Sequence, residues 1–488
     1  MYDSIGLPIA FLTALAGLAQ PTTYAPTPSE PVASAASRAS GAPEVFERVW
    51  EVLDRSYPFF DSKGIDWRAL GKVYRPRIDE HTTDEELFEI TMAMLGHLND
   101  AHVCLDNGSR RECALQTEPA WAEGFSLGVV TAAYLGGKAE HELGGTLTYG
   151  KLSEELGYIH LRDCQDDHDD VGRAIDAALA GLEGVEGMVV DIRGHPGGAD
   201  KVAQVFAGRF ADRRRHFMTG FTRYGPGHGD FAPATYWNVE PAGPRQFTGP
   251  VIVITNRQTA SAGDTLTLAM RVLPHVTVVG EMTEGALGSQ YPESLPNGWT
   301  MLVTYKANLD PSGRCWDGIG IPPDLRVRNT AADVREGVDP ALELAVSLLE
   351  LGELEHQDES AGLATIRLSM ATEFIERAAR GDVPGAVEWL AAERASDDRT
   401  YFLSVDECFV LVQQLLGQGR VSECVALLEA CIEEFPTIVA PYGMLATIHV
   451  QNGDAESARA LISEAGDLEA WYSWETAFLR RAERSLGD

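Results

Sequence analysis

Ser261 has the surroundings of a nucleophile. It lies between Ala260 and Ala262, in a short loop that joins a strand-like apolar run, 251–255, to an amphipathic run, 264–272. Small neighbours leave the hydroxyl accessible, and the first N–H groups of a helix have no intrahelical acceptor, so they can bind an anion. A serine at such a junction can also cap the helix, so the loop by itself leaves two interpretations, nucleophile and N-cap.

Glycines in a second loop could supply hydrogen-bond donors to the same chemistry. An apolar run, 188–192, is followed by the loop GHPGG, 194–198. Because glycine lacks a Cβ, its backbone N–H can approach a ligand closely. The N–H groups of Gly197 and Gly198, with that of Ala262, could therefore form an oxyanion hole for a tetrahedral intermediate. An ordinary strand-to-helix turn is the alternative.

Six segments, including those that contain the two loops above, follow one another in the order typical of one protein family. They are GYIHLRD (157–163), VVDIRGHPGG (189–198), ITNRQTASAGD (254–264), VVGEMTEGALGSQ (278–290), LPNGW (295–299) and GIGIPPDLRV (318–327). From about Glu44 to Arg328 the chain resembles a serine peptidase family that contains the C-terminal processing (tail-specific) proteases, the tricorn protease core and the interphotoreceptor retinoid-binding modules. The resemblance implies an α/β fold with a crotonase-like ββα core, peptide hydrolysis, and Ser261 as the nucleophile.

The resemblance also distinguishes two catalytic designs. One branch of the family uses a Ser–Lys dyad, but the lysine position is occupied here by Ala286, and no lysine follows Lys306. The tricorn-like branch uses a histidine and an acid. The segment LNDAHV places His102 at the histidine position, and Asp317 stands where the tricorn core has a glutamate. The implied set is Ser261 as nucleophile, His102 as general base and Asp317 orienting the imidazole.

Histidine suits the role of base because an imidazole with a pKa of roughly 6.5 can take and return a proton near neutral pH. His97 is interpreted as a structural residue, and Asp324 as one that makes a turn contact. Asp310 is a further acid near Asp317. His195 departs from the family pattern, which usually has asparagine in the glycine loop, and its role stays open.

Composition is that of a soluble globular protein. The 488 residues are 44% hydrophobic and 23% charged, with a formal net charge of −34. This charge argues against nucleic acid and anionic membrane surfaces as partners. The seven cysteines show no metal-ligand spacing, although a Cys104–Cys113 pair could form a disulfide. We therefore expect no metal and no cofactor.

The N-terminal residues suggest export. Residues 1–19 contain an apolar run typical of a signal peptide and too short to span a bilayer, but no basic residue precedes that run. Residues 20–42 are rich in Pro, Ser, Thr and Ala, which is typical of a disordered tether. The expected location is periplasmic or extracellular, with no integral membrane span. A cytoplasmic protein with a disordered tail is the alternative.

The remaining chain divides into three parts. We expect an N-terminal helical domain over 43–118 that carries His102, a peptidase core over 119–330 and an all-α domain over 331–488. In the last part, Gly419 and Gly453 are 34 residues apart within similar segments, which resembles a tetratricopeptide-like array. Such an array could bind a protein partner, whereas a helical appendage packed on the core is the alternative.

These observations predict a metal-independent serine endopeptidase that acts through an acyl-enzyme on Ser261, with a peptide or protein as substrate. Two alternatives from other classes remain. Retinoid-binding modules share the fold, so the chain could be a non-catalytic binding protein. The same residues could also serve an esterase-like serine hydrolase.

Overall fold

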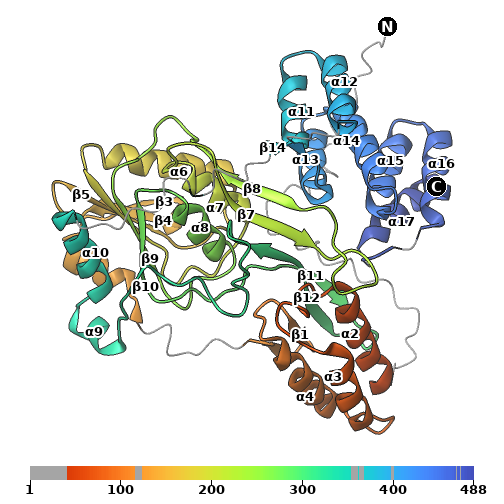
Figure 1. The fold of residues 1–488 in the computed structure, drawn as a ribbon, viewed down its shortest axis with the longest axis horizontal. Coiled ribbons are helices and arrows are strands. Elements are labelled where there is room, and N and C mark those ends of the chain that lie inside the picture. The colour runs from red at the N-terminus through yellow and green to blue at the C-terminus, as the bar shows by residue number, and fades with distance from the viewer. Residues whose placement is uncertain are drawn as a thin grey trace.

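The structure, a computed structural model, shows a central α/β core with helical parts at both ends of the chain (Figure 1). It describes residues 41–115, 124–352, 361, 368–396, 401–468, 470–472 and 474–487. The signal-like segment 1–19 and nearly all of the predicted tether, 20–42, lie outside the described residues. No helix in the described ranges is both long and apolar enough to cross a membrane.

The core is built on a seven-stranded sheet with the strand order β13-β10-β9-β6-β5-β4-β3. The strands are β3 (Glu140–Glu142), β4 (Leu147–Lys151), β5 (Leu156–Leu161), β6 (Gly187–Asp191), β9 (Val251–Thr255), β10 (Val276–Gly280) and β13 (Leu325–Arg326). Strands β5, β6, β9, β10 and β13 run parallel, and β4 and β3 are antiparallel to their neighbours. Every residue of β6, β9 and β10 is buried, as expected for parallel strands covered on both faces.

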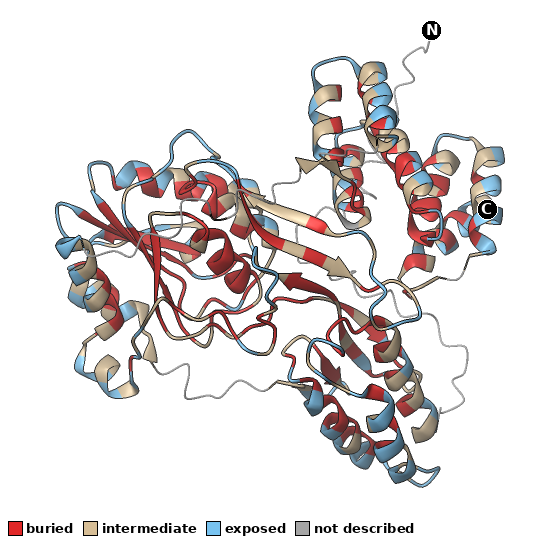
Figure 2. Cartoon of the chain, viewed as in Figure 1, coloured by how far each residue is buried: buried red, intermediate tan, exposed pale blue. Residues whose placement is uncertain are grey.

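Alternate residues of the core strands pack against different helices. Val251 and Val253 face the cluster formed with α6 (His168–Gly181), α7 (Asp200–Ala207) and α8 (Ala262–Arg271). Ile252 and Ile254 face the opposite side, where α10 (Pro340–Leu351) contributes Ala341, Leu342 and Ala345. The two-residue period of a strand thus divides the core into two layers of apolar side chains (Figure 2).

Helix α10 extends the core beyond the boundary predicted at residue 330. Leu342 is fully buried against the sheet. The preceding Asp339 caps α10 through the N–H of Leu342 and also binds Arg193, at the start of the glycine loop. The core unit therefore needs the residues up to Gly352, because removing α10 would expose one face of the sheet.

A second, antiparallel sheet joins the N-terminal helices to the core. Its strands are β1 (Cys104–Asp106), β2 (Arg111–Cys113), β7 (Arg215–Thr222), β8 (Thr235–Val239), β11 (Ser289–Ser294) and β12 (Thr300–Leu309). Strand β1 pairs with β12, with Cys104 opposite Leu302, although about 200 residues separate them in the chain. The N-terminal part and the core therefore share one sheet and are not independent domains.

Three helices pack on the end of this sheet. They are α2 (Ala42–Ser56), α3 (Trp67–Tyr74) and α4 (Asp84–Leu95), and their apolar faces form one cluster with Met301 and Val303 of β12. Helix α4 begins with a capping box in which Thr83 and Glu86 exchange side-chain and backbone hydrogen bonds. It ends in the short helical turn Gly96–Leu98, directly before the loop that carries His102.

Paired helices make up the C-terminal part. They are α11 (Met370–Ala379), α12 (Val383–Arg394), α13 (Val405–Gly417), α14 (Val421–Glu434), α15 (Val439–Gln451), α16 (Ala455–Gly466) and α17 (Glu475–Gly487). Helices α13 and α15 begin 34 residues apart, and so do α14 and α16. The smaller elements are α5 (Leu127–Val129), α9 (Ala331–Glu336), β14 (Leu368–Ser369) and β15 (Tyr401–Phe402).

An aromatic junction fastens the C-terminal helices to the rest of the chain. Tyr472, only 3% exposed, packs its ring edge-on against Tyr291 of β11 and Tyr305 of β12, and its hydroxyl donates to the carbonyl of Arg223. The guanidinium of Arg55 on α2 lies 4.4 Å from the ring centroid of the neighbouring Trp471. The junction thus contacts helix α2 and strands β11 and β12 of the second sheet at one place.

Removing the Tyr472 ring should loosen this junction. We expect Tyr472→Ala to destabilise the protein by about 3 kcal/mol, because truncating a buried aromatic side chain leaves a cavity. Tyr472→Phe keeps the ring and loses one hydrogen bond, so its cost should be about 1 kcal/mol. Urea unfolding followed by tryptophan fluorescence measures both. Equal midpoints for Tyr472→Ala and the wild type would show that the helices do not depend on this contact.

Candidate active site

Ser261 occupies the turn between β9 and α8 in a strained backbone conformation. Its φ and ψ are 54° and −118°, outside the regions that non-glycine residues usually adopt. Such a conformation costs of order 1–3 kcal/mol and persists only where the surroundings impose it. Here Thr259 Oγ1 donates to Ile192 O (2.9 Å), and Ala260 N donates to His195 O (2.9 Å). The side chain of Ser261 makes no capping hydrogen bond, which favours the nucleophile over the N-cap interpretation.

The glycine loop lies directly against this serine. A Cβ on Gly197 would lie 2.5 Å from Ser261 Cβ, and a Cβ on Gly198 would collide with the carbonyl of Cys164. Both glycines have positive φ, 111° and 137°. Only glycine therefore fits at these two positions, and the loop approaches the serine as closely as backbone atoms allow.

The backbone donors of the predicted oxyanion hole differ in their availability. The N–H of Gly197 donates to His195 Nδ1 within its own loop (3.1 Å). Ala262 is the first residue of α8, so its N–H has no intrahelical acceptor. Among the described residues, neither the N–H of Ala262 nor that of Gly198 donates a hydrogen bond to another backbone group. Of the three predicted donors, Gly197 is thus already engaged, whereas Gly198 and Ala262 remain to bind an anion.

His195 acquires a structural role from these contacts. Its side chain is completely buried, and burial lowers its pKa to about 4. The ring is therefore neutral at pH 7, with Nδ1 accepting from Gly197 and Nε2 lying 3.4 Å from Cys164 Sγ. His195, which departs from the family pattern, thus stabilises the glycine loop by accepting a hydrogen bond within it.

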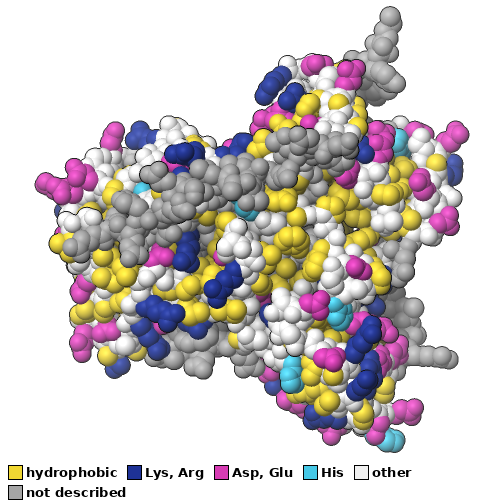
Figure 3. Space-filling view, viewed as in Figure 1, with side chains coloured by type: hydrophobic (Ala, Val, Ile, Leu, Met, Phe, Trp, Pro, Cys, Tyr) yellow, Lys and Arg dark blue, Asp and Glu magenta, His cyan; other side chains and the backbone are white. Residues whose placement is uncertain are grey.

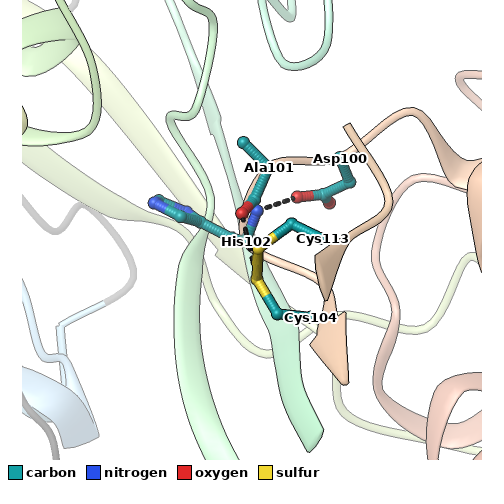
Figure 4. Close-up of a disulfide and its surroundings, with 5 residues drawn as sticks. All are labelled: Asp100, Ala101, His102, Cys104 and Cys113. Carbon is teal, nitrogen blue, oxygen red and sulfur yellow. Dashed lines mark hydrogen bonds between the residues drawn. A yellow bond between two sulfur atoms is a disulfide. The ribbon is translucent and has the colours of Figure 1, made fainter. Parts of the chain in front are cut away.

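His102 is half-buried in the loop between the turn at Gly96–Leu98 and β1. Its backbone N–H donates to Asp100 Oδ1 (2.8 Å), and Figure 4 shows its ring pointing away from Asp100 and from the disulfide. Ring atom Nδ1 lies 2.5 Å from the carbonyl oxygen of Gly288. Because a carbonyl can only accept, Nδ1 carries the proton and Nε2 keeps a free lone pair, as a general base requires.

Asp317 contacts the backbone N–H of the same residue, Gly288. Its Oδ2 accepts from the N–H of Gly288 (3.2 Å), and its Oδ1 accepts from Lys63 Nζ (2.9 Å). The sequence predicted that Asp317 would orient the imidazole itself. In the structure Gly288 stands between them, since its carbonyl accepts from His102 while its N–H donates to Asp317. Burial and the neighbouring Asp100 raise the pKa of Asp317, and Lys63 opposes this shift.

Two carboxylates that the sequence analysis missed flank the site, one from the buried Asp264 and one from the half-buried Asp200. Asp264, one turn after Ser261 on α8, accepts from the N–H groups of Gly285 (3.2 Å) and Ala286 (3.0 Å). Burial raises its pKa to about 6. Asp200, at the start of α7, accepts from Thr265 Oγ1 (2.8 Å), and burial raises its pKa as well. Both carboxyl groups interact electrostatically with His102.

Asp264 lies beside Ala286, the position at which the Ser–Lys branch of the family has its lysine. Ala286 gives its backbone N–H to Asp264. The signal in the sequence is the aspartate that directly follows ASAG in the nucleophile loop. A carboxylate in this place suits a histidine that becomes positively charged during proton transfer.

A disulfide holds the hairpin that follows His102. Cys104 and Cys113 lie directly opposite each other on β1 and β2 and are bonded, as the sequence had allowed. The bridge restricts the hairpin two residues after the candidate base (Figure 4). The other five cysteines are not disulfide-bonded.

The remaining residues considered from the sequence have structural partners. His97 Nε2 lies 3.0 Å from Tyr74 Oη, and Asp310 accepts from Trp316 Nε1 (2.9 Å). Asp324 accepts from Arg271 on α8 and from the N–H of Val278 on β10, so its contacts are distant in sequence and not the local turn contact that the sequence predicted. These residues hold elements of the fold in place.

Comparison with known proteins defines the class of this site. Residues 155–327 match Peptidase family S41, and residues 42–96 match the Tricorn protease C1 domain. The chain thus contains an S41 serine peptidase domain preceded by a C1 domain, which confirms the resemblance seen in the sequence. Its architecture is the mixed α/β fold of S41 peptidases, with a helical N-terminal part and C-terminal helices.

Individual relatives cover parts of the chain. Carboxy-terminal processing protease CtpA of Bacillus subtilis is 28% identical over 151 residues, 30% of this chain and 30% of that protein. Tricorn protease homolog 1 of Streptomyces coelicolor is 28% identical over 202 residues, 41% of this chain and 17% of that protein. The chain spans less than a third of the length of either relative.

A solved structure resembles a larger share of the chain. The crystal structure of a candidate peptidase from Parabacteroides merdae is 28% identical and superposes with a TM-score of 0.59. The match covers 64% of this chain and 97% of that one. The likeness therefore extends well beyond the segments matched by sequence.

The contact between Gly197 and Ser261 predicts a sharp effect of one methyl group. Gly197→Ala should slow acylation of Ser261 by at least about 100-fold, because the new Cβ would displace either the loop donors or the serine. Gly184→Ala is the matched control, since Gly184 also has a positive φ (89°) but open space around it. The rate of labelling by a fluorophosphonate measures both. Similar labelling rates for the two variants would show that the glycine loop does not control the reactivity of Ser261.

Proposed function

We propose that this chain is a serine endopeptidase that cleaves peptide bonds through an acyl-enzyme on Ser261, with His102 as general base. One observation carries the proposal. Ser261 has a strained backbone, its side chain makes no capping hydrogen bond, and it lies in close contact with the Gly197–Gly198 loop. An S41 domain that contains these residues supports it. Relatives named as carboxy-terminal processing and tricorn proteases make peptides or proteins the expected substrates.

In the proposed mechanism His102 Nε2 removes the proton of Ser261 Oγ as the oxygen attacks the substrate carbonyl. The oxyanion that forms is bound by the N–H groups of Gly198 and Ala262. The hydrogen bond from His102 Nδ1 to Gly288 O fixes the ring, and the carboxyl groups of Asp264 and Asp200 can offset the positive charge that the ring gains during proton transfer.

Collapse of the tetrahedral intermediate completes the acylation half-reaction. The C–N bond breaks, and the imidazolium of His102 gives its proton to the leaving amine. Water then attacks the ester on Ser261 with the same base and the same oxyanion donors, and the released acid restores the free serine. Asp317 supports these steps through Gly288 and makes no recorded contact with the ring among the described residues.

We further infer a crotonase-like arrangement of the core, supported by the parallel strands β6, β9 and β10, each followed by a helix or a loop at the site.

The C-terminal helices are proposed to be tetratricopeptide-like and to bind a protein partner. The 34-residue recurrence of α13–α14 and α15–α16 supports this.

Export to the periplasm or the extracellular space is proposed as the location. The Cys104–Cys113 disulfide supports it, because structural disulfides persist in oxidising compartments. The formal net charge is −34, and on the face drawn in Figure 3 acidic side chains are interspersed with Lys and Arg. Substrate selection therefore does not follow from net charge alone.

A fluorophosphonate probe tests the function. The wild type should be labelled, Ser261→Ala should not be labelled, and His102→Ala should be labelled at least about 1,000-fold more slowly. His97→Ala is the matched histidine control and should react like the wild type. Labelling at a residue other than Ser261, or none at all, would contradict the assignment and favour a non-catalytic binding protein.

A peptide substrate separates the peptidase from an esterase and identifies the base. Hydrolysis of an internally quenched peptide should fall as the pH is lowered through the range in which imidazoles become protonated, because a protonated ring cannot accept the serine proton. Activity on an ester but not on any peptide would favour an esterase. Loss of activity in Lys306→Met, with retention in His102→Ala, would overturn the choice of base.

A further inference from the structure

Lys63 binds two loops that reach the site from different parts of the chain. It follows helix α2, and its Nζ lies within hydrogen-bond distance of Tyr57 Oη (3.1 Å), Leu98 O (3.0 Å), Asn99 O (3.2 Å) and Asp317 Oδ1 (2.9 Å). The lysine side chain is 15% exposed and that of Asp317 is 0% exposed. An ammonium with so many oxygen partners in a nearly dry place is far more constrained than a surface ion pair.

The first of these loops carries the candidate base. Leu98 and Asn99 end the turn after α4, only three residues before His102. Asn99 has a left-handed backbone (φ 46°), which turns its carbonyl toward Lys63. Lys63 therefore holds the start of the histidine loop.

The second loop carries the acid. Besides the ion pair between Lys63 and Asp317, Asn99 Nδ2 donates to Gly318 O (2.8 Å). A Cβ on Gly318 would collide with the carbonyl of Asn99, so the two loops touch along their backbones. The contact is thus formed by backbone and side chain together, with Lys63 at its centre.

Charge explains why a cation is needed here. Asp317 and Asp100 are both buried, and the nearby Asp100 raises the pKa of Asp317. The other titratable groups that interact with this pair are Tyr57 and Cys315, whose pKa values are both raised, so they stay neutral near pH 7. Burial lowers the pKa of Lys63, but the attraction of Asp317 and Asp100 outweighs it and keeps the ammonium charged.

We propose that Lys63 is a positioning residue for catalysis: it docks the His102 loop on the core and pairs with Asp317, so that Gly288 presents its carbonyl to His102. The chain of contacts runs from Lys63 Nζ to Asp317, from Asp317 Oδ2 to Gly288 N, and from Gly288 O to His102 Nδ1. This inference rests on the proposed function, because it gives Lys63 a role in that same site. The N-terminal part thereby contributes both the base and the cation that supports it.

Lys63→Met tests the proposal with a side chain of similar length and no charge. Without the ammonium, Asp317 should take up a proton at a higher pH, and the bond that aligns Gly288 should weaken. We expect the rate of fluorophosphonate labelling at pH 7 to fall at least 10-fold. The midpoint of the acidic limb of its pH profile should move upward by at least half a pH unit. Lys72→Met, at an exposed lysine on α3, is the matched control and should leave both quantities unchanged.

A double variant distinguishes positioning from general stabilisation. If Lys63 acts through Asp317, Lys63→Met combined with Asp317→Asn should react no more slowly than Asp317→Asn alone. Rates that multiply in the double variant, or a Lys63→Met protein with the wild-type rate and pH midpoint, would overturn the role of Lys63 while leaving the peptidase intact. A wild-type chain that does not label would instead overturn the proposed function itself, and this role with it. Circular dichroism and thermal unfolding confirm that each variant is folded.

Discussion

The pairing of β1 with β12 is the contact on which the site depends. His102 immediately precedes β1, whereas Ser261, Gly288 and Asp317 belong to the core, and this antiparallel pair places the N-terminal hairpin on the core's second sheet. The Cys104–Cys113 bridge stiffens the hairpin, and Met301 of β12 is buried among the N-terminal helices. The sheet pairing thus brings the loop that carries His102 to Gly288 of the core, far away in the sequence.

Buried ion pairs secure the loops around the serine. Arg193, at the root of the glycine loop, is 2% exposed and binds both Asp191 and Asp339. Asp339 in turn caps α10, so the helix that covers the far face of the sheet is tied to the loop that approaches Ser261. Charged groups in such dry places are costly unless each is paired, so loss of one partner would disturb the loop as well as the helix. Local strain at Ser261 is sustained by this rigid frame.

Local sequence was sufficient for the features that depend on local geometry. The small residues around Ser261 and the glycines at 197–198 predicted a serine exposed at a strand-to-helix turn next to a close-approaching loop, and the structure has both. The core strands were recognisable because they are apolar on both faces. The comparisons confirmed the peptidase family that these motifs resembled.

Features that depend on contacts distant in sequence could not be predicted in the same way. Nothing in the sequence near Gly288 shows that its carbonyl meets His102, because this contact is set by the sheet pairing. The core boundary was placed too early because α10 continues the helical pattern of the residues after it, although it packs on the sheet. Lys63 lies in an unremarkable turn, and its four partners are assembled only by the fold.

The structure of the chain after reaction with a phosphonate tests the central claim most directly. The account predicts a phosphorus bonded to Ser261 Oγ, with one phosphoryl oxygen about 2.7–3.1 Å from the N–H groups of Gly198 and Ala262. It also predicts His102 Nε2 beside the adduct, with Nδ1 still on Gly288 O. An adduct on Ser261 with its oxygen directed away from both N–H groups, or with His102 turned out of the site, would contradict it.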